Sequence, residues 1–172
     1  MKFSKLVVTL LAAFFTITTF AQAPAQTPTP AAAPGPPPAY GPPIGIDLAK
    51  KAAAAALAEA KKGNWYMAIA VVDISGTLVY YEKMDNTQTG SVTVAIDKAK
   101  TAALFKRPTK AFQDGVAGGG AGLRILGLHG ATPVEGGIPI FVNGQIVGAI
   151  GVSGDSSEHD GVCAAAGAVV AK

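Results

Sequence analysis

The globular part of the chain opens with a run of helix-forming residues, followed by two apolar runs that are typical of strands. Residues 48–62 are dominated by Ala, Leu, Lys and Glu, with Asp47 placed to cap the start of a helix and Gly63 its end. Residues 67–73 and 77–84 are rich in Val, Ile and Tyr, and a short Ile-Ser-Gly segment separates them. This pattern predicts a helix and then a β-hairpin.

A polar loop over 85–90 separates this hairpin from a second amphipathic segment. Apolar and small residues recur at helical spacing over 91–105, and Ser91 is placed to cap that helix. Pro108 ends it, and Thr109 can cap a short third helix over 109–116. The Ala-Gly-Gly-Gly-Ala-Gly run that follows predicts a flexible or tightly turned loop, and the short apolar stretch after it fits no single element.

The last third of the chain contains the clearest hairpin. Residues 138–142 and 145–153 flank Asn143 and Gly144, and Asn-Gly is the strongest short-range signal for a two-residue β-turn. Three glycines interrupt the second of these strands, where glycine normally weakens pairing. They favour close approach of a helix or a second subunit, with a ligand as the second interpretation; they are Gly148, Gly151 and Gly154.

A final helix completes the predicted domain. Asp155 and Glu158 have the spacing of a capping box for a helix over 156–170. The order is therefore helix, hairpin, helices, hairpin, helix. Because hairpins pair their strands antiparallel, the sequence predicts an α+β domain with an antiparallel β-sheet of about four to five strands flanked by helices, rather than a Rossmann fold.

The N-terminal region has the composition of an export signal and a spacer. Lys2 and Lys5 precede an almost unbroken apolar stretch over 6–15, and small and polar residues follow up to Ala21. This order predicts a signal peptide over 1–21, so that the protein is exported to the periplasm or secreted. Residues 22–43 contain nine of the 12 prolines, which predicts a disordered Pro/Ala-rich tether ahead of a domain over 44–172.

Charge and cysteine content narrow the range of functions. Loss of Lys2 and Lys5 with the signal peptide leaves 12 basic against 11 acidic residues, and the remaining basic residues are scattered. This distribution argues against nucleic-acid binding. The apolar stretch of the signal is too short to remain as a membrane span, and none follows it. The single Cys163 excludes an intrachain disulfide, so the domain must depend on hydrophobic packing.

Few side chains are placed for chemistry. The glycine-rich segments lack the Gly-Lys-Ser/Thr ending of a phosphate-binding loop. The two histidines, His129 and His159, are too few for a zinc site, and either is more often a surface or hydrogen-bonding residue than a metal ligand. Cys163 lies one helical turn after His159 but among alanines, which favours a small buried residue over a nucleophile.

Several segments, in this order, resemble the signature of the GlcG/HbpS-like family. The resemblance extends from about Leu48 to the C-terminus. The matching segments are 71–76, 95–102, 132–140, Asn143-Gly144, 147–154 and Glu158-His159-Asp160.

The resemblance implies an antiparallel sheet flanked by helices, dimers or larger homo-oligomers, and frequent binding of haem or a related tetrapyrrole. Some relatives use a histidine near the first helix for haem, whereas 48–62 contains none. His129 and His159 are therefore alternative candidate ligands of a haem iron. The expected ligand-binding residues are those in glycine-rich loops beside helix termini, namely His129, Glu135, Gly136, Gly137, His159 and Asp160.

Three functions follow from these features. The first is an exported module that binds haem or another small ligand, with no catalytic residue assigned. The second is an enzyme that degrades haem or processes a small acid near Glu135 and His159. The third is an oligomeric accessory domain that binds a partner and is displayed on its proline-rich tether.

Overall fold

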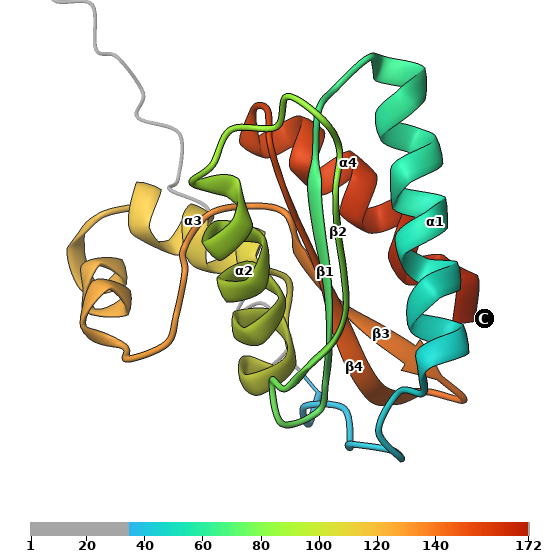
Figure 1. Cartoon of the computed structure of the whole chain (residues 1–172). Coiled ribbons are helices and arrows are strands. Elements are labelled where there is room, and N and C mark those ends of the chain that lie inside the picture. Colours follow the sequence, from blue (N-terminus) through green and yellow to red (C-terminus); the bar gives the residue numbers. More distant parts are fainter. Residues whose placement is uncertain (1–34, 172) are drawn as a thin grey trace, which may run out of the picture. The chain divides into compact units, whose positions relative to one another are not determined.

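The computed structural model describes residues 35–171, which form a sheet with helices on both faces (Figure 1). The predicted signal peptide and most of the predicted tether lie outside this range. The strands are β1 (Ala68–Asp73), β2 (Leu78–Lys83), β3 (Gly137–Val142) and β4 (Gln145–Ser153). They pair antiparallel in the order β2-β1-β4-β3, which confirms the predicted α+β fold with four strands.

The helices form one layer on each face of this sheet. Figure 1 shows α1 (Ile46–Gly63) and α4 (Ser157–Ala168) on one face and α2 (Ser91–Phe105) on the other. The chain then continues through α3 (Thr109–Ala117) and the 3₁₀ helix η1 (Gly120–Gly127) before it enters β3, and a short η2 (Val169–Ala171) follows α4. None of the helices in residues 35–171 has the length and apolar character to cross a membrane.

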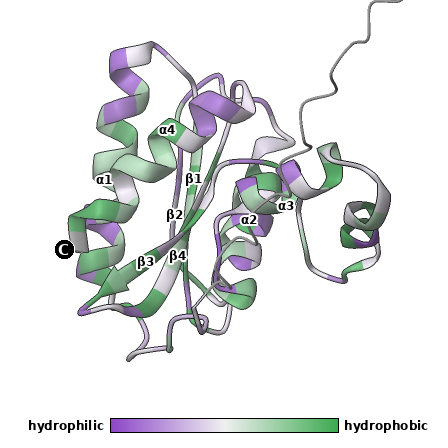
Figure 2. Cartoon of the chain, turned by 180° about the vertical axis from the view of Figure 1, so that it is seen from behind, coloured by the Kyte–Doolittle hydropathy of each residue, from purple (hydrophilic) through white to green (hydrophobic). Residues whose placement is uncertain are grey.

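Two apolar clusters hold the layers together. On one face, isoleucine and valine side chains of β1 and β4 pack against alanines of α1 and against Cys163 and Ala164 of α4. On the other face the contact is built almost entirely from alanines of α2 and β1. Figure 2 shows the hydrophobic character of β3 and β4 between these layers.

Small residues bring α2 very close to the sheet. A Cβ atom on Gly151 would overlap the carbonyl oxygen of Ala95 and lie 2.5 Å from the backbone nitrogen of Ala99. The glycines of β4 therefore serve close packing with a helix, which is the first of the two interpretations drawn from the sequence. The Asn143-Gly144 turn also has the expected form, with φ of 50° and 77°.

Helix ends differ from the sequence-based expectation. The N-cap of α1 is Gly45 rather than Asp47, and its C-cap is the left-handed Asn64 rather than Gly63. Thr109 does not cap α3 but lies inside it, because its buried hydroxyl accepts a hydrogen bond from the Gly137 N–H at 2.9 Å. Long-range contacts, which local spacing does not report, decide these boundaries.

A short segment before α1 occupies the place in the sheet that β1 leaves open. β1 ends with Asp73 opposite Gly148 of β4. Beyond that point residues 39–44, here called the strap, run parallel to β4. The N–H of Gly41 donates to the carbonyl of Ile146 at 2.8 Å, and that of Ile44 to the carbonyl of Val147 at 2.7 Å.

The strap is also fastened to the end of α2. The Tyr40 hydroxyl donates to the carbonyl oxygen of Ala103 at 2.7 Å, and the Lys106 ammonium lies 4.1 Å from the centre of the Tyr40 ring. Lys106 also donates to the carbonyl of Pro38 at 3.0 Å. The sequence predicted a tether over 22–43; from Ala39 onward this segment is hydrogen-bonded to the domain.

Candidate functional site

A buried ion pair joins α2 to α4 at the edge where β3 begins. The Lys98 ammonium lies 2.7 Å from a carboxylate oxygen of Asp160, and the two side chains are only 1% and 4% exposed. Lys98 also donates to the carbonyl of Val152 at 3.2 Å, while Asp160 accepts from the N–H of Asp155 at 3.3 Å. Burial raises the pKa of the Asp160 carboxyl, although Lys98 acts against this shift.

Gly136 and Gly137 pack directly around this pair. A Cβ atom on Gly136, whose φ is +123°, would lie 2.9 Å from the Lys98 nitrogen, and one on Gly137 would overlap the Lys98 carbonyl. The structure therefore brings Gly136, Gly137 and Asp160 together around Lys98, a residue that the sequence analysis did not single out. All of them are buried. This arrangement fixes the start of β3 against both helices.

Glu135 lies just outside this buried group, between α3 and α4. Its N–H donates to the side-chain oxygen of Gln113 at 2.7 Å, and its carboxylate is 3.8 Å from the Lys110 ammonium. A side chain at Gly161 would collide with the Glu135 carboxylate. Glu135 is therefore held by α3 on one side and by α4 on the other.

His159 is oriented by two neighbours at the start of α4. Its Nδ1 lies 2.6 Å from the Asp155 carboxylate, and its ring stacks on Trp65 with centroids 4.0 Å apart. The hydrogen bond to His159 is the main reason why the pKa of Asp155 is lowered. Because a carboxylate only accepts hydrogen bonds, Nδ1 carries the proton in this pair, which leaves Nε2 as the nitrogen available to a ligand.

Cys163 does not form a reactive pair with this histidine. The thiol is buried, and burial raises its pKa from 9.0 to about 12. A thiol with this pKa is almost entirely protonated near neutral pH and is a poor nucleophile. The expectation of a small buried cysteine agrees with this environment.

His129 lies on a different part of the molecule from His159. It is exposed and follows η1 directly. The loop next to it is anchored to α2, because the Thr101 hydroxyl donates to the carbonyl of Gly130 at 3.1 Å. The structure thus places the two histidines on separate elements. Within residues 35–171, no group of three or more His, Cys, Asp or Glu side chains is arranged to hold a metal ion.

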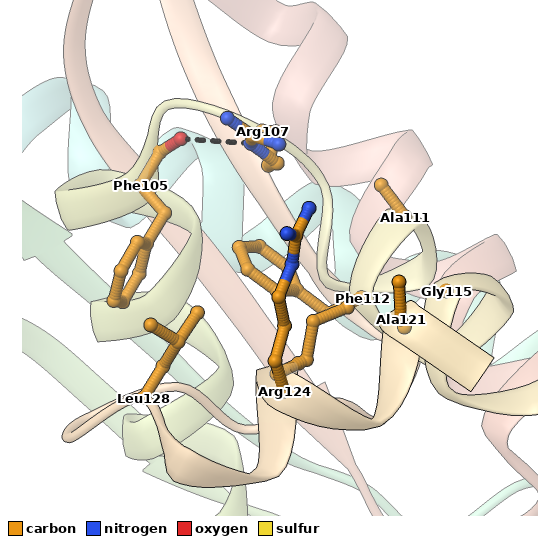
Figure 3. Close-up of a pocket in the computed structure, with 10 residues that line it drawn as sticks. Phe105, Arg107, Ala111, Phe112, Gly115, Ala121, Arg124 and Leu128 are labelled. Carbon is orange, nitrogen blue, oxygen red and sulfur yellow. Dashed lines mark hydrogen bonds between the residues drawn. The ribbon is translucent and has the colours of Figure 1, made fainter. Parts of the chain in front are cut away.

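A cavity that the sequence analysis missed lies where α3 and η1 fold over the end of α2 (Figure 3). Its volume is about 540 Å³, within the range of about 300–1,000 Å³ typical of small-molecule sites. Two arginines and a set of mostly apolar residues line it; they are Phe105, Arg107, Ala111, Phe112, Gly115, Ala121, Gly122, Arg124, Ile125 and Leu128.

Glycines allow η1 to fold back on α3 and form this cavity. A Cβ atom on Gly122 would overlap the carbonyl of Gly115, and one on Gly115 would meet the Ile125 side chain at 2.6 Å. The segment predicted as a flexible or tightly turned loop is therefore partly a 3₁₀ helix with close contacts. A possible sequence signal was the combination of these glycines with apolar residues and two nearby arginines.

Several apolar residues of the cavity wall or its margin face solvent. Leu123, Leu126 and Leu128 are 49%, 64% and 42% exposed, and η1 contains no buried residue. In a small domain, a cluster of exposed leucines beside a cavity is typical of a binding surface. The same cluster would be expensive to leave in water without such a role.

The fold and site together define a small antiparallel α+β domain with helices on both faces and a helical arm that encloses an apolar, basic cavity. Residues 44–169 match the family described as haem degrading protein HbpS-like, and the chain belongs to this family. The resemblance seen in the sequence motifs is thereby confirmed.

Relatives and solved structures agree with this membership. The chain is 40% identical to protein GlcG of Escherichia coli K12 over 106 residues, which cover 62% of this chain and 78% of that protein. A double mutant of HbpS from Streptomyces reticuli is similar with a TM-score of 0.70 and 30% identity, over 85% of this chain and 99% of the other. PduOC in complex with haem is similar with a TM-score of 0.65 and 25% identity, over 73% and 92%.

Proposed function

We propose that this protein binds haem or a closely related tetrapyrrole in the cavity between α3 and η1. The observation that supports this most directly is the cavity itself, because it combines a suitable volume with aromatic and aliphatic walls. Membership of the HbpS-like family, and the similarity to a protein solved as a haem complex, support the same ligand.

The residues of the cavity fit a flat, largely apolar macrocycle. Phe105 and Phe112 meet edge to face with ring centroids 5.4 Å apart, and Leu128 and Ile125 also line the cavity. Aromatic and aliphatic surfaces of this kind favour burial of a large ring system. Bound haem would supply the iron and its redox chemistry, and the protein would supply the apolar enclosure and the iron ligand.

His129 is the first candidate for that ligand. It follows Leu128, the last residue of the cavity wall, and its exposed position leaves the imidazole accessible. His159 is the alternative, since Asp155 orients it with Nε2 available. A carboxylate partner on Nδ1 is a common way to fix a ligating histidine.

The experiment that tests this function is a haemin titration of residues 22–172, followed by visible absorbance. A saturable shift of the Soret band is expected, and it should be lost in His129→Ala and kept in His159→Ala. The reverse pattern would transfer the ligand role to His159. An absorbance spectrum identical to that of free haemin would remove haem as the ligand.

Oxidative degradation of the bound macrocycle is a second candidate, favoured by the description of the family. It predicts that the Soret band disappears when a reductant is added to the complex in air. A stable spectrum under these conditions would indicate binding without turnover.

Export and self-association complete the proposal. The signal-like residues 1–21 support delivery to the periplasm or the exterior, and the family membership supports a dimer or larger homo-oligomer. Cell fractionation of the full-length chain and light scattering of the purified protein test the two statements separately.

A further inference from the structure

We infer that Arg107 and Arg124 recognise the carboxylate groups of the ligand, so that the cavity selects tetrapyrroles with free acidic side chains. This inference rests on the proposed function and adds a chemical class to it. A cavity with only apolar walls would accept an esterified macrocycle as readily as the free acid. Two guanidinium groups at the same cavity change that preference.

The two arginines approach the cavity from different elements. Arg107 follows the end of α2, and Arg124 belongs to η1. Figure 3 shows the Arg124 side chain extending toward Arg107 across the cavity, with Phe112 beside both. Groups that lie far apart on separate elements, but reach one cavity, are suited to contact one ligand at two points.

Neither guanidinium is neutralised by the protein in residues 35–171. No carboxylate lies within 4.0 Å of Arg107 or Arg124. The acidic groups of the neighbouring α3 region are engaged elsewhere, since Asp114 pairs with Lys110 at 2.8 Å and Glu135 lies 3.8 Å from the same ammonium. An anionic ligand would therefore supply the counter-charge that the cavity lacks.

Arg107 is positioned with its terminal nitrogens available. Its Nε donates to the carbonyl of Phe105 at 3.2 Å, and its guanidinium lies 5.5 Å from the centre of the Phe112 ring. These contacts restrict the side chain but use only one of its donors. The planar guanidinium can then offer its remaining N–H groups to a carboxylate in a two-point interaction.

The test compares haemin with haemin dimethyl ester, in which both carboxylates are blocked, in one detergent-containing buffer. The wild-type chain over residues 22–172 should bind haemin about tenfold or more tightly than the ester, because a hydrogen bond to a charged group contributes about that factor. Arg107→Ala and Arg124→Ala should each weaken haemin binding about tenfold and leave ester binding unchanged. Binding of the ester also shows that each variant is folded.

Lys110→Ala is the matched control, because Lys110 is a nearby cation that does not line the cavity. It should bind haemin as the wild type does. Metal-free protoporphyrin IX, followed by fluorescence, should show the same dependence on both arginines, which separates carboxylate recognition from iron ligation.

The possible results distinguish this inference from the function on which it rests. If the wild type binds haemin and its ester equally, and the arginine variants do the same, haem binding stands and carboxylate recognition is wrong. If Lys110→Ala weakens binding as much as the arginine variants, general charge attraction replaces the specific pair. If the wild type binds neither compound, the proposed function fails and this inference with it.

Discussion

Lys98 and Asp160 place two opposite charges inside the protein, at the point where α2, α4 and the start of β3 meet. Removing two charges from water is costly, and their mutual attraction repays that cost only when the geometry is good. Here the carbonyl of Val152 and the N–H of Asp155 add further hydrogen bonds. The pair therefore specifies how the layers meet, and removal of one partner should be far more damaging than its surface equivalent.

Asp160→Asn and Lys98→Met each break this pair and should lower the free energy of unfolding by about 3–5 kcal/mol, because one charge remains buried without a partner. Urea denaturation at neutral pH measures the change. Lys110→Met, which breaks the exposed pair with Asp114, is the control and should alter stability little. Equal effects of the buried and exposed changes would contradict this interpretation.

The same variant has a defined pH dependence. Burial already raises the pKa of Asp160 above 3.8, and loss of the Lys98 charge should raise it further. A carboxyl with a raised pKa binds its proton more readily in the folded state, so its contribution to stability is present at low pH and is lost as the pH rises through the folded pKa. Lys98→Met should therefore be less destabilised relative to wild type at about pH 4 than at about pH 7.

At the scale of elements, the contact between α2 and β4 depends on the absence of side chains. The alanines of α2 and the glycines of β4 let the helix backbone lie directly on the strand. Close packing of this kind tolerates added atoms poorly, since the neighbours at Gly151 are backbone groups rather than flexible side chains.

Gly151→Ala should consequently lower the free energy of unfolding by about 1–3 kcal/mol or more, because its Cβ would overlap the backbone of α2. Gly90→Ala is a matched substitution at a position with φ of −62° and no atom within 4 Å of the added Cβ. It should leave stability within about 0.5 kcal/mol of wild type. Thermal and urea denaturation of both variants test the comparison, and a stable Gly151→Ala protein would refute it.

The elements that local chemistry determines were predictable from the sequence. Asn143-Gly144 specified its turn, and the Val- and Ile-rich runs specified the strands around it. The candidate site was only partly predictable. Gly136, Gly137 and Asp160 do meet, but the Lys98 that unites them was invisible because its partner is 62 residues away. The cavity was missed because it arises when Gly115 and Gly122 let η1 fold over α3, a contact that no periodicity reports.

At the scale of the whole molecule, the strap joins the N-terminal side of the domain to two elements at once. It pairs with β4 through Gly41 and Ile44, and Tyr40 attaches it to the end of α2. Lys106, which binds the strap, stands between Phe105 and Arg107 of the cavity wall. The family match begins at Ile44, so most of the strap lies outside it.

A chain that begins at Ile44 should be less stable than one that begins at Gly35 by about 2 kcal/mol, because it loses strap hydrogen bonds and the Tyr40 contacts. Tyr40→Phe in the longer chain should lose about 1 kcal/mol, since only the hydroxyl is removed. Urea denaturation of the three proteins measures both steps. Identical midpoints for the two chain lengths would show that the strap contributes nothing to folding.

The parallel course of the strap along β4 also determines how the domain responds to mechanical load. A pull transmitted through Gly35 acts along the strap, whose hydrogen bonds to Ile146 and Val147 run across that direction. Bonds arranged in this way share the force in shear instead of opening one after another like a zipper. A domain held by its N-terminal side would thus keep its grip on the strap under tension, while the same tension would reach the end of α2 through Tyr40.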